Sequence, residues 1–267
     1  MIDLADRPDV APELRLVPHA FRETFGRPAQ GVWYAPGVLT LLPGVTVNAR
    51  WGAIVAGEAR ADGILELASI NKPAERIHQP IAEVTAVPAW AEPILDRLRP
   101  QFGGATLLCS VDLPRGSGLA PGKALACAAE LALGDLYQAP VPVPAEGIDL
   151  DQGLRLLVID TRVRRDVPVR TVSPIIGRMD LGSALTAFHR AQSAEPVQDL
   201  VVATALGAGA LGASMLVDDP GRPAVALVRA EDSREIRTRV VDACLRAGFV
   251  APRFLTVSPC RGAYRVA

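Results

Sequence analysis

The most informative turn in this sequence reads Asp112-Leu113-Pro114-Arg115-Gly116-Ser117-Gly118-Leu119-Ala120-Pro121-Gly122-Lys123. It follows a short apolar run, residues 106–111, that predicts a buried strand, and it precedes an Ala- and Leu-rich run, residues 123–137, that predicts a buried helix. A Gly-rich turn in this position presents backbone N–H groups at a helix N-terminus, where they and the helix dipole favour a phosphate. The simpler alternative is a tight turn that needs glycine only for a positive φ.

The turn does not match the P-loop motif. That motif requires G-x-x-x-x-G-K-[ST], but Ser117 stands where its first glycine would be, and Ala124 follows Lys123, so the hydroxyl that binds Mg²⁺ is missing. Lys123, one of two lysines in the chain, and Arg115 are candidates to neutralise a bound phosphate, although either can equally be a solvated surface residue. The candidate phosphate or nucleotide site comprises Arg115, Gly116, Ser117, Gly118, Leu119, Gly122 and Lys123.

Further segments accompany this turn along the chain. They are Phe21-Arg22-Glu23-Thr24-Phe25-Gly26 and Tyr34-Ala35-Pro36-Gly37 near the N-terminus, and then residues 156–164, 208–215 and 247–263. Taken in this order, the segments and the turn resemble the motifs of galactokinases, which are members of the GHMP small-molecule kinase family. The turn itself is similar to the D-L-P-x-G-A-G-L-S-S-S motif of that family. The resemblance covers the chain from residue 21 to residue 267.

The resemblance implies a two-lobed α+β fold. Its N-terminal lobe is a mixed sheet backed by helices, its C-terminal lobe is ferredoxin-like, and a reduced cleft should persist between them. The expected division is an N-terminal lead-in over 1–18, a first lobe over 19–172 and a second lobe over 173–267. The residues themselves predict helix, strand, strand, helix and strand after residue 175, which is typical of half a ferredoxin-like sandwich. In the first lobe they predict separate short strands, at 32–35, 38–42, 45–48 and 53–56.

The chain departs from the family at the positions that carry its chemistry. Val38 replaces an Arg, residues 43–47 replace G-E-H-T-D, residues 120–122 replace S-S-S, and residues 216–222 replace T-G-G-G-F-G-G. The chain is also shorter than galactokinases and offers no counterpart for the family's proposed base or its Mg²⁺-binding Glu. The sugar-binding carboxylates and His, the phosphate-stabilising Arg and the expected Mg²⁺ ligands are therefore all missing.

These losses predict a degenerate galactokinase-like protein that lacks sugar-kinase activity and acts as a binding or regulatory protein, because phosphoryl transfer depends on Mg²⁺ and cationic groups. The alternative is a divergent ATP-dependent GHMP small-molecule kinase, or a repurposed enzyme that uses the same cleft. For that alternative the resemblance implies ATP with Mg²⁺ as the cofactor. The residues alone identify neither a catalytic group nor a metal site.

Composition narrows the class of protein. The chain has 267 residues, of which 49% are hydrophobic, and a net charge of −1, so it is globular and has no basic surface for nucleic acid or anionic membranes. Its four cysteines are too sparse for a disulfide framework, and its three histidines are expected at the surface. The N-terminus has no apolar signal-peptide segment, so we expect a cytoplasmic protein. The resemblance implies that this chain lacks two helical insertions of galactokinases, and their loss should expose apolar surface, which is a candidate homodimer interface.

Overall fold

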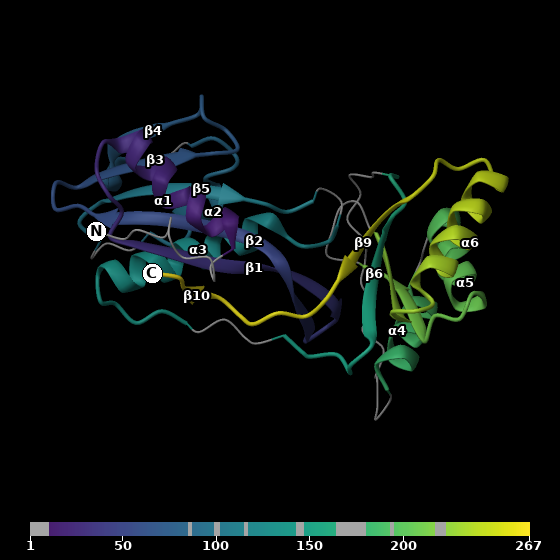
Figure 1. The fold of residues 1–267 in the computed structure, drawn as a ribbon. Coiled ribbons are helices and arrows are strands. Elements are labelled where there is room, and N and C mark those ends of the chain that lie inside the picture. Colours follow the sequence, from purple (N-terminus) through teal and green to yellow (C-terminus); the bar gives the residue numbers. More distant parts are fainter. Residues whose placement is uncertain are drawn as a thin grey trace.

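The computed structural model describes residues 11–84, 87–98, 102–114, 117–142, 147–163, 180–192, 195–216 and 223–267. These residues form two lobes, each built on its own sheet (Figure 1), as the α+β prediction requires. The helices of the first lobe are α1 (Pro12–Phe25), α2 (Glu92–Leu95) and α3 (Pro121–Leu136), and those of the second are α4 (Leu181–Arg190), α5 (Pro196–Gly207) and α6 (Ser233–Arg246). None of the helices within these ranges has the length and apolar character that a membrane span requires.

The sheet of the first lobe is mixed, as predicted. Its strands lie in the order β10-β1-β2-β5-β3-β4, and β3 runs parallel to β5 while the other neighbours are antiparallel. The strands are β1 (Gly31–Leu42), β2 (Val45–Ala59), β3 (Ile64–Ser69), β4 (Ile77–Pro80), β5 (Ala105–Val111) and β10 (Tyr264–Arg265). Between β4 and α2 the chain makes one short 3-10 turn, Ile81–Glu83.

Helices cover both faces of this sheet because successive side chains of β1 point to opposite sides. Val32 packs in one apolar cluster with Leu14 and Phe21 of α1. Trp33 packs in another cluster with the small side chains of α3, and its indole N–H donates to an Asp135 carboxylate oxygen on α3 at 2.7 Å. The sheet is therefore the middle layer of the lobe, with α1 on one face and α3 on the other.

Helix α1 corrects the expected N-terminal lead-in. Residues 12–18, which the sequence analysis assigned to a lead-in, are helical, and the helix starts at Pro12. Proline is well accommodated at the first helical position because its missing N–H has no partner there. The buried residues Leu14, Val17 and Phe21 also follow the spacing of one helix face, so the apolar side chains outweigh Pro18 inside the helix.

The first two strands are longer than predicted. Pro36-Gly37 does not end a strand, because Pro36 pairs opposite Gly52 and Gly37 opposite Ala49 within one continuous β1–β2 hairpin. Two extra residues of β2, Arg50 and Trp51, form a bulge at that point. A proline cannot donate a hydrogen bond to the neighbouring strand, and a bulge accommodates this loss. Strand β1 therefore continues through Pro36 to Leu42 before the chain turns.

The second lobe has a complete ferredoxin-like arrangement. Its strands are β6 (Leu154–Asp160), β7 (Gly212–Met215), β8 (Ala224–Arg229) and β9 (Arg253–Val257), in the antiparallel order β7-β8-β6-β9. Helices α4 and α5 connect β6 to β7, and α6 connects β8 to β9, which gives the β-α-β-β-α-β order of that fold. The sequence analysis identified only half of this motif, because it placed the first strand in the other lobe.

Two strands lie outside the expected lobe ranges. β6 belongs to the second sheet although it falls within 19–172, and β10 pairs with β1 of the first sheet although it falls within 173–267. The chain therefore enters the second lobe before β6 and returns to the first lobe after β9 (Figure 1). A linear division missed this because pairing partners of a strand are set by long-range packing, not by its own pattern.

One apolar core joins the lobes. The β1–β2 hairpin extends from the first sheet, and Leu39, Leu41, Leu42 and Val47 near its tip pack with buried residues of the second lobe. Those partners include Leu156, Val158, Phe188, Leu216 and Val257. The tip of the hairpin thus completes the core of the ferredoxin-like lobe.

His189 corrects the expectation that the histidines are surface residues. It is 8% exposed, its Nδ1 accepts the Met215 backbone N–H at 3.4 Å, and its Nε2 lies 3.2 Å from an Asp199 carboxylate oxygen. These contacts connect α4, α5 and β7. Burial lowers the pKa of His189, an effect that Asp199 opposes, so the neutral ring with its proton on Nε2 is the form that fits the fold.

We expect acid to destabilise the protein through His189. The lowered pKa in the folded state means that the unfolded chain binds the proton first, so the free energy of unfolding should decrease as the pH falls from about 7 to about 5. His189→Gln should flatten this dependence, measured by urea unfolding at each pH. The matched control is His19→Gln on the exposed side of α1, which should keep the wild-type slope. An unchanged slope in His189→Gln would show that another group is responsible.

Candidate functional site

The Gly-rich turn lies where the two lobes meet. Of its predicted site residues, Arg115 and Gly116 lie outside the described residues. Ser117 is buried, and its hydroxyl donates to the Pro114 backbone oxygen at 2.5 Å, which closes the turn. Gly118 has a φ of +72°, so the turn does use glycine for a left-handed backbone.

The space beside Gly118 is filled by apolar side chains. A Cβ atom on Gly118 would lie 2.6 Å from the Leu216 Cδ1 atom and 3.2 Å from the Leu39 Cδ1 atom. Leu119, the next residue, is 1% exposed and belongs to the core that joins the lobes. The glycine therefore allows two lobes to approach closely, and the turn packs against leucine rather than facing an open cradle.

The start of α3 offers few free donors for an anion. Pro121 has no N–H, and the backbone N–H groups of Lys123 and Ala124 both donate to the Ala120 oxygen, at 3.0 and 3.2 Å. Ala120 itself adopts a left-handed conformation with φ 45°. Gly122 lies against Pro93 of α2, where a Cβ would be 3.2 Å from Cγ, and the Lys123 side chain is exposed. At the described start of α3, the backbone N–H groups of Lys123 and Ala124 are thus already used within the chain.

The hairpin tip occupies the segment that should hold the sugar-binding residues. Around residues 43–47 the described chain presents Pro43, Gly44 and Val45 at the turn, flanked by the buried Leu42 and Val47. A sugar hydroxyl needs hydrogen-bonding partners, which these residues do not supply, and within 43–47 only Thr46 carries a hydrogen-bonding side chain. The exposed turn residues Pro43 and Gly44 lie beside Leu42 and Val47, which pack in the core that joins the lobes.

A cavity of about 440 Å³ remains between the lobes. Pro114 and Ser117 line it from the first lobe, and Asp160, Arg253 and Phe254 are among the residues that line it from β6 and β9. Asp160 is 6% exposed and accepts the Arg162 backbone N–H at 2.9 Å, while Arg162 adopts a positive φ of 63°. The polar residues that line this cavity are thus Ser117, Asp160 and Arg253.

Comparison with known proteins identifies the architecture. No family model matches the chain. The galactokinase of Streptomyces coelicolor is 25% identical over 375 residues, an alignment that covers 92% of this chain and 97% of the relative. The structure superposes on galactokinase from Lactococcus lactis, solved with galactose, with a TM-score of 0.76, 15% identity and coverage of 94% and 99%. The chain is a galactokinase-like protein of the GHMP kinase fold. The structure is less similar to mevalonate kinase of Methanococcus jannaschii, with a TM-score of 0.58 and 12% identity. That superposition covers 86% of this chain and 98% of the mevalonate kinase.

The alignment also bears on length. It extends over more positions than the galactokinase-like chain has residues, so the relative contains segments that this chain lacks. Both likenesses agree with the resemblance drawn from the motifs, and the sequence alignment agrees with the shortening. Because the identity to the solved structures is low, their likeness to this chain shows the fold alone.

The structure brings only part of the predicted site together. Ser117 faces the cavity between the lobes, whereas Lys123 is not among the residues that line it. Arg253 of β9, which pairs opposite Asp160, is the residue that the sequence analysis missed in the galactokinase-like chain. Its position depends on the pairing of β6 with β9, for which the sequence carries no local signal.

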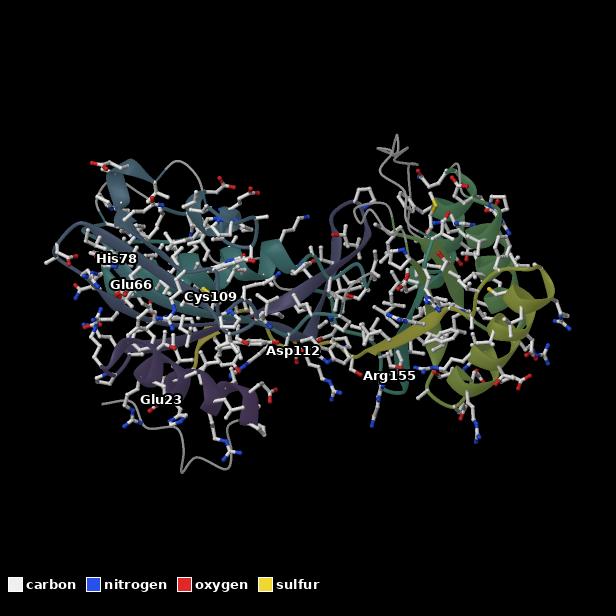
Figure 2. The ribbon with its side chains drawn as sticks, turned by 90° about the horizontal axis from the view of Figure 1, so that it is seen from above. Glu23, Glu66, His78, Cys109, Asp112 and Arg155 are labelled. Atoms are coloured by element: carbon white, nitrogen blue, oxygen red, sulfur yellow. The ribbon has the colours of Figure 1, made fainter. Side chains whose placement is uncertain are left out.

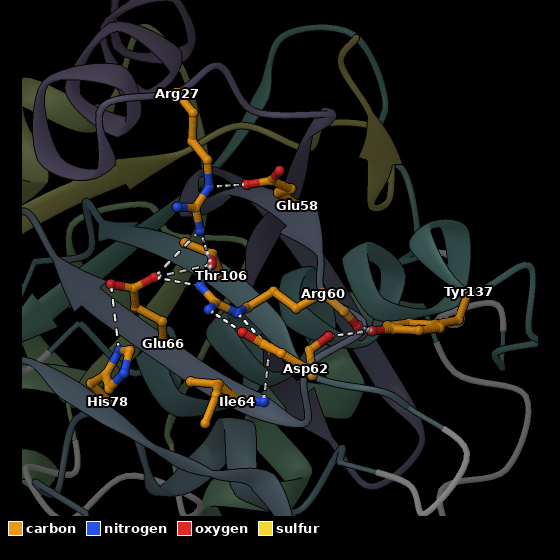
Figure 3. Close-up of polar contacts among 10 residues, drawn as sticks. Arg27, Glu58, Arg60, Asp62, Ile64, Glu66, His78, Thr106 and Tyr137 are labelled. Carbon is orange, nitrogen blue, oxygen red and sulfur yellow. Dashed lines mark hydrogen bonds and ion pairs between the residues drawn. The ribbon is translucent and has the colours of Figure 1, made fainter.

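A polar network at the far end of the first sheet is structural. Arg27 and Arg60 both donate to the buried Thr106 hydroxyl, at 2.8 and 3.1 Å, and both contact Glu66 (Figure 3). Glu58 pairs with Arg27, and Asp62 pairs with Arg60, whose guanidinium lowers the pKa of that carboxyl. Glu66 and His78 lie at the end of the molecule remote from the second lobe (Figure 2). The charges satisfy one another, so the network gives no reason to place a ligand there.

Proposed function

We propose that this galactokinase-like protein lacks sugar-kinase activity and acts in the cytoplasm as a binding or regulatory protein. The observation that carries the proposal is the contact of Leu216 and Leu39 with Gly118. A transferred phosphate would have to approach that turn, and an apolar contact cannot compensate the hydration that the charged phosphate would lose on leaving water. Leu216 also stands where the resemblance places a Thr of the third motif, so the same residue that closes the space removes a hydroxyl.

The expected result is that neither Mg·ATP nor Mg·ADP stabilises the protein. A ligand that binds the folded state at about 100 times its dissociation constant adds about 2.7 kcal/mol to the free energy of unfolding, which thermal unfolding readily detects. We therefore expect unchanged melting temperatures with either nucleotide at millimolar concentration. We also expect no ADP release above background when ATP is combined with galactose or other sugars over hours.

A galactokinase measured in parallel provides the positive control for both assays. Saturable stabilisation by Mg·ATP would contradict the proposal in its strict form. Sugar-dependent ADP release would overturn it. Lys123→Ala is the informative variant, because Lys123 is exposed at the start of α3 and is, with Arg115, a candidate cation for a phosphate at this turn.

The cavity between the lobes favours a second candidate, a divergent small-molecule kinase or a repurposed enzyme. Buried Asp160 and exposed Arg253 line it, and the nearby Thr161 hydroxyl is buried without a hydrogen-bond partner among the described residues. Unsatisfied buried polar atoms are rare in native proteins and occur at functional sites. A nucleotide effect that disappears in Lys123→Ala, or turnover that disappears in Asp160→Asn, would favour this function.

A further inference from the structure

A second cavity, of about 560 Å³, lies on the other face of the first sheet. It is formed by the N-terminal end of α1, by β1 and β2, and by the segment before β10. Its polar and aromatic lining includes Tyr34, Arg50, Trp51, Asp112, Arg261 and Tyr264. Helix α1 covers this face of the sheet and α3 covers the opposite face, so the sheet lies between the cavity and α3. Asp112 marks its position near the junction of the lobes (Figure 2).

The β2 bulge places two of these residues. Arg50 and Trp51 are the two extra residues between the pairs Pro36–Gly52 and Gly37–Ala49, so they are not held in the ladder with β1. Bulges redirect side chains and are frequent beside functional sites. The Tyr34 hydroxyl donates to the Arg50 backbone oxygen at 2.7 Å, which fixes the bulge against β1. One side of the cavity is thus formed by the β2 bulge, which the Tyr34 hydrogen bond holds in place.

Both arginines of the cavity are held by aromatic rings. The Arg261 guanidinium carbon lies 3.3 Å from the centre of the Tyr264 ring, and that of Arg50 lies 4.8 Å from the centre of the Trp51 ring. Neither guanidinium forms an ion pair with a carboxylate of the described residues. A guanidinium that stacks on a ring keeps its N–H edge available for a carboxylate or phosphate. Two guanidinium groups without a carboxylate partner among the described residues therefore line the cavity.

Two carboxylates complete the rim. Glu13 of α1 and Asp112 are exposed, and neither forms an ion pair with a described residue. The backbone N–H of Asp112 donates to the Gly52 oxygen at 3.0 Å, which holds this residue beside the bulge. Burial, with added repulsion from Cys260, Tyr264, Glu13 and Asp112, raises the pKa of Tyr34, so its hydroxyl stays protonated between these acids. The floor of the cavity, with Leu14 and Ile54, is apolar.

We propose that this cavity binds a small zwitterion of the amino-acid class with a large apolar side chain. Arg50 and Arg261 would receive its carboxylate, Glu13 and Asp112 its ammonium group, and the apolar floor its side chain. The volume is that of a small-molecule site, and the balanced rim disfavours a multiply charged anion. No residue lines both this cavity and the one between the lobes, so the inference does not depend on whether the protein is a kinase.

The test is calorimetric titration of the full chain with L-tryptophan, L-phenylalanine and L-leucine. Each hit is compared with analogues that lack one charge, which for L-tryptophan are indole-3-propionate and tryptamine. We expect saturable binding of at least one amino acid and about tenfold weaker binding of both of its analogues, since each loses one charge-assisted contact. No saturation by any of the three amino acids at millimolar concentration overturns the proposal. Equal affinity for an amino acid and its analogues overturns it as well.

Two variants assign the charges to their partners. Arg261→Gln should weaken the amino acid about tenfold and leave tryptamine unaffected, whereas Asp112→Asn should weaken the amino acid and leave indole-3-propionate unaffected. The control is Arg239→Gln on exposed α6, where the arginine pairs with Glu235. Equal effects of all three substitutions would overturn the assignment.

Discussion

Leu216→Ala is expected to lower the free energy of unfolding by about 3 kcal/mol, because truncation of a fully buried leucine loses its transfer energy and leaves a cavity. Leu216 is 2% exposed and packs in the core that contains both the hairpin tip and the second sheet. If the residue instead lined a ligand site, its truncation would leave the stability of the free protein nearly unchanged. Urea unfolding followed by circular dichroism measures the difference.

Leu245→Ala is the matched control for this substitution. Leu245 is 54% exposed on α6, so its truncation should change the free energy of unfolding by less than about 0.5 kcal/mol. The comparison separates loss of core packing from any effect of leucine on helix or unfolded-state properties. A Leu216→Ala variant as stable as Leu245→Ala would contradict the packed junction on which the proposed loss of kinase activity rests.

Gly118→Ala is expected to cost about 2 to 3 kcal/mol. The methyl group is strained at a φ of +72° and also overlaps Leu216, whose Cδ1 atom is 2.6 Å from the ideal Cβ position. Gly26→Ala is an unusually close control, because Gly26 has the same φ of +72° and nothing lies within 4 Å of its ideal Cβ position. Gly26→Ala should therefore cost only the conformational part, about 1 kcal/mol.

The double variant Gly118→Ala, Leu216→Ala tests the contact directly. Because the smaller residue 216 leaves room for the new methyl group, the two effects should not add, and the coupling should be about 1 kcal/mol in the stabilising direction. Additive effects within experimental error would mean that residues 118 and 216 do not touch in solution. Thermal unfolding of the four proteins completes the cycle.

The motifs predicted the fold well because each marks an element that packs locally. The turn at 112–123 does join β5 to α3, and the ferredoxin-like order after residue 175 does continue through α6 and β9. The sequence did not predict which strands pair with each other when they are far apart along the chain. β6 and β10 both read as ordinary strands, and only their contacts with β8, β9 and β1 assign them to a sheet.

The candidate site was harder to predict than the fold. The altered motifs indicated lost chemistry, but no pattern in the sequence revealed that Leu216 would fill the space at Gly118. The amino-acid cavity was missed for a related reason. Arg50 and Trp51 follow strand-like residues, and their bulge depends on the register of β2 against β1, which the residues of β2 alone do not define.

The return of the chain to the first lobe has a consequence for the order of synthesis. β10 is an edge strand of the first sheet, and Val32 exchanges backbone hydrogen bonds with residues 266 and 267. While the ribosome makes the second lobe, β1 has an unpaired edge and the wall of the cavity that contains Arg261 and Tyr264 is absent. The first lobe thus emerges early but is finished late, so a nascent chain that stalls within the second lobe exposes a strand edge to association with other chains.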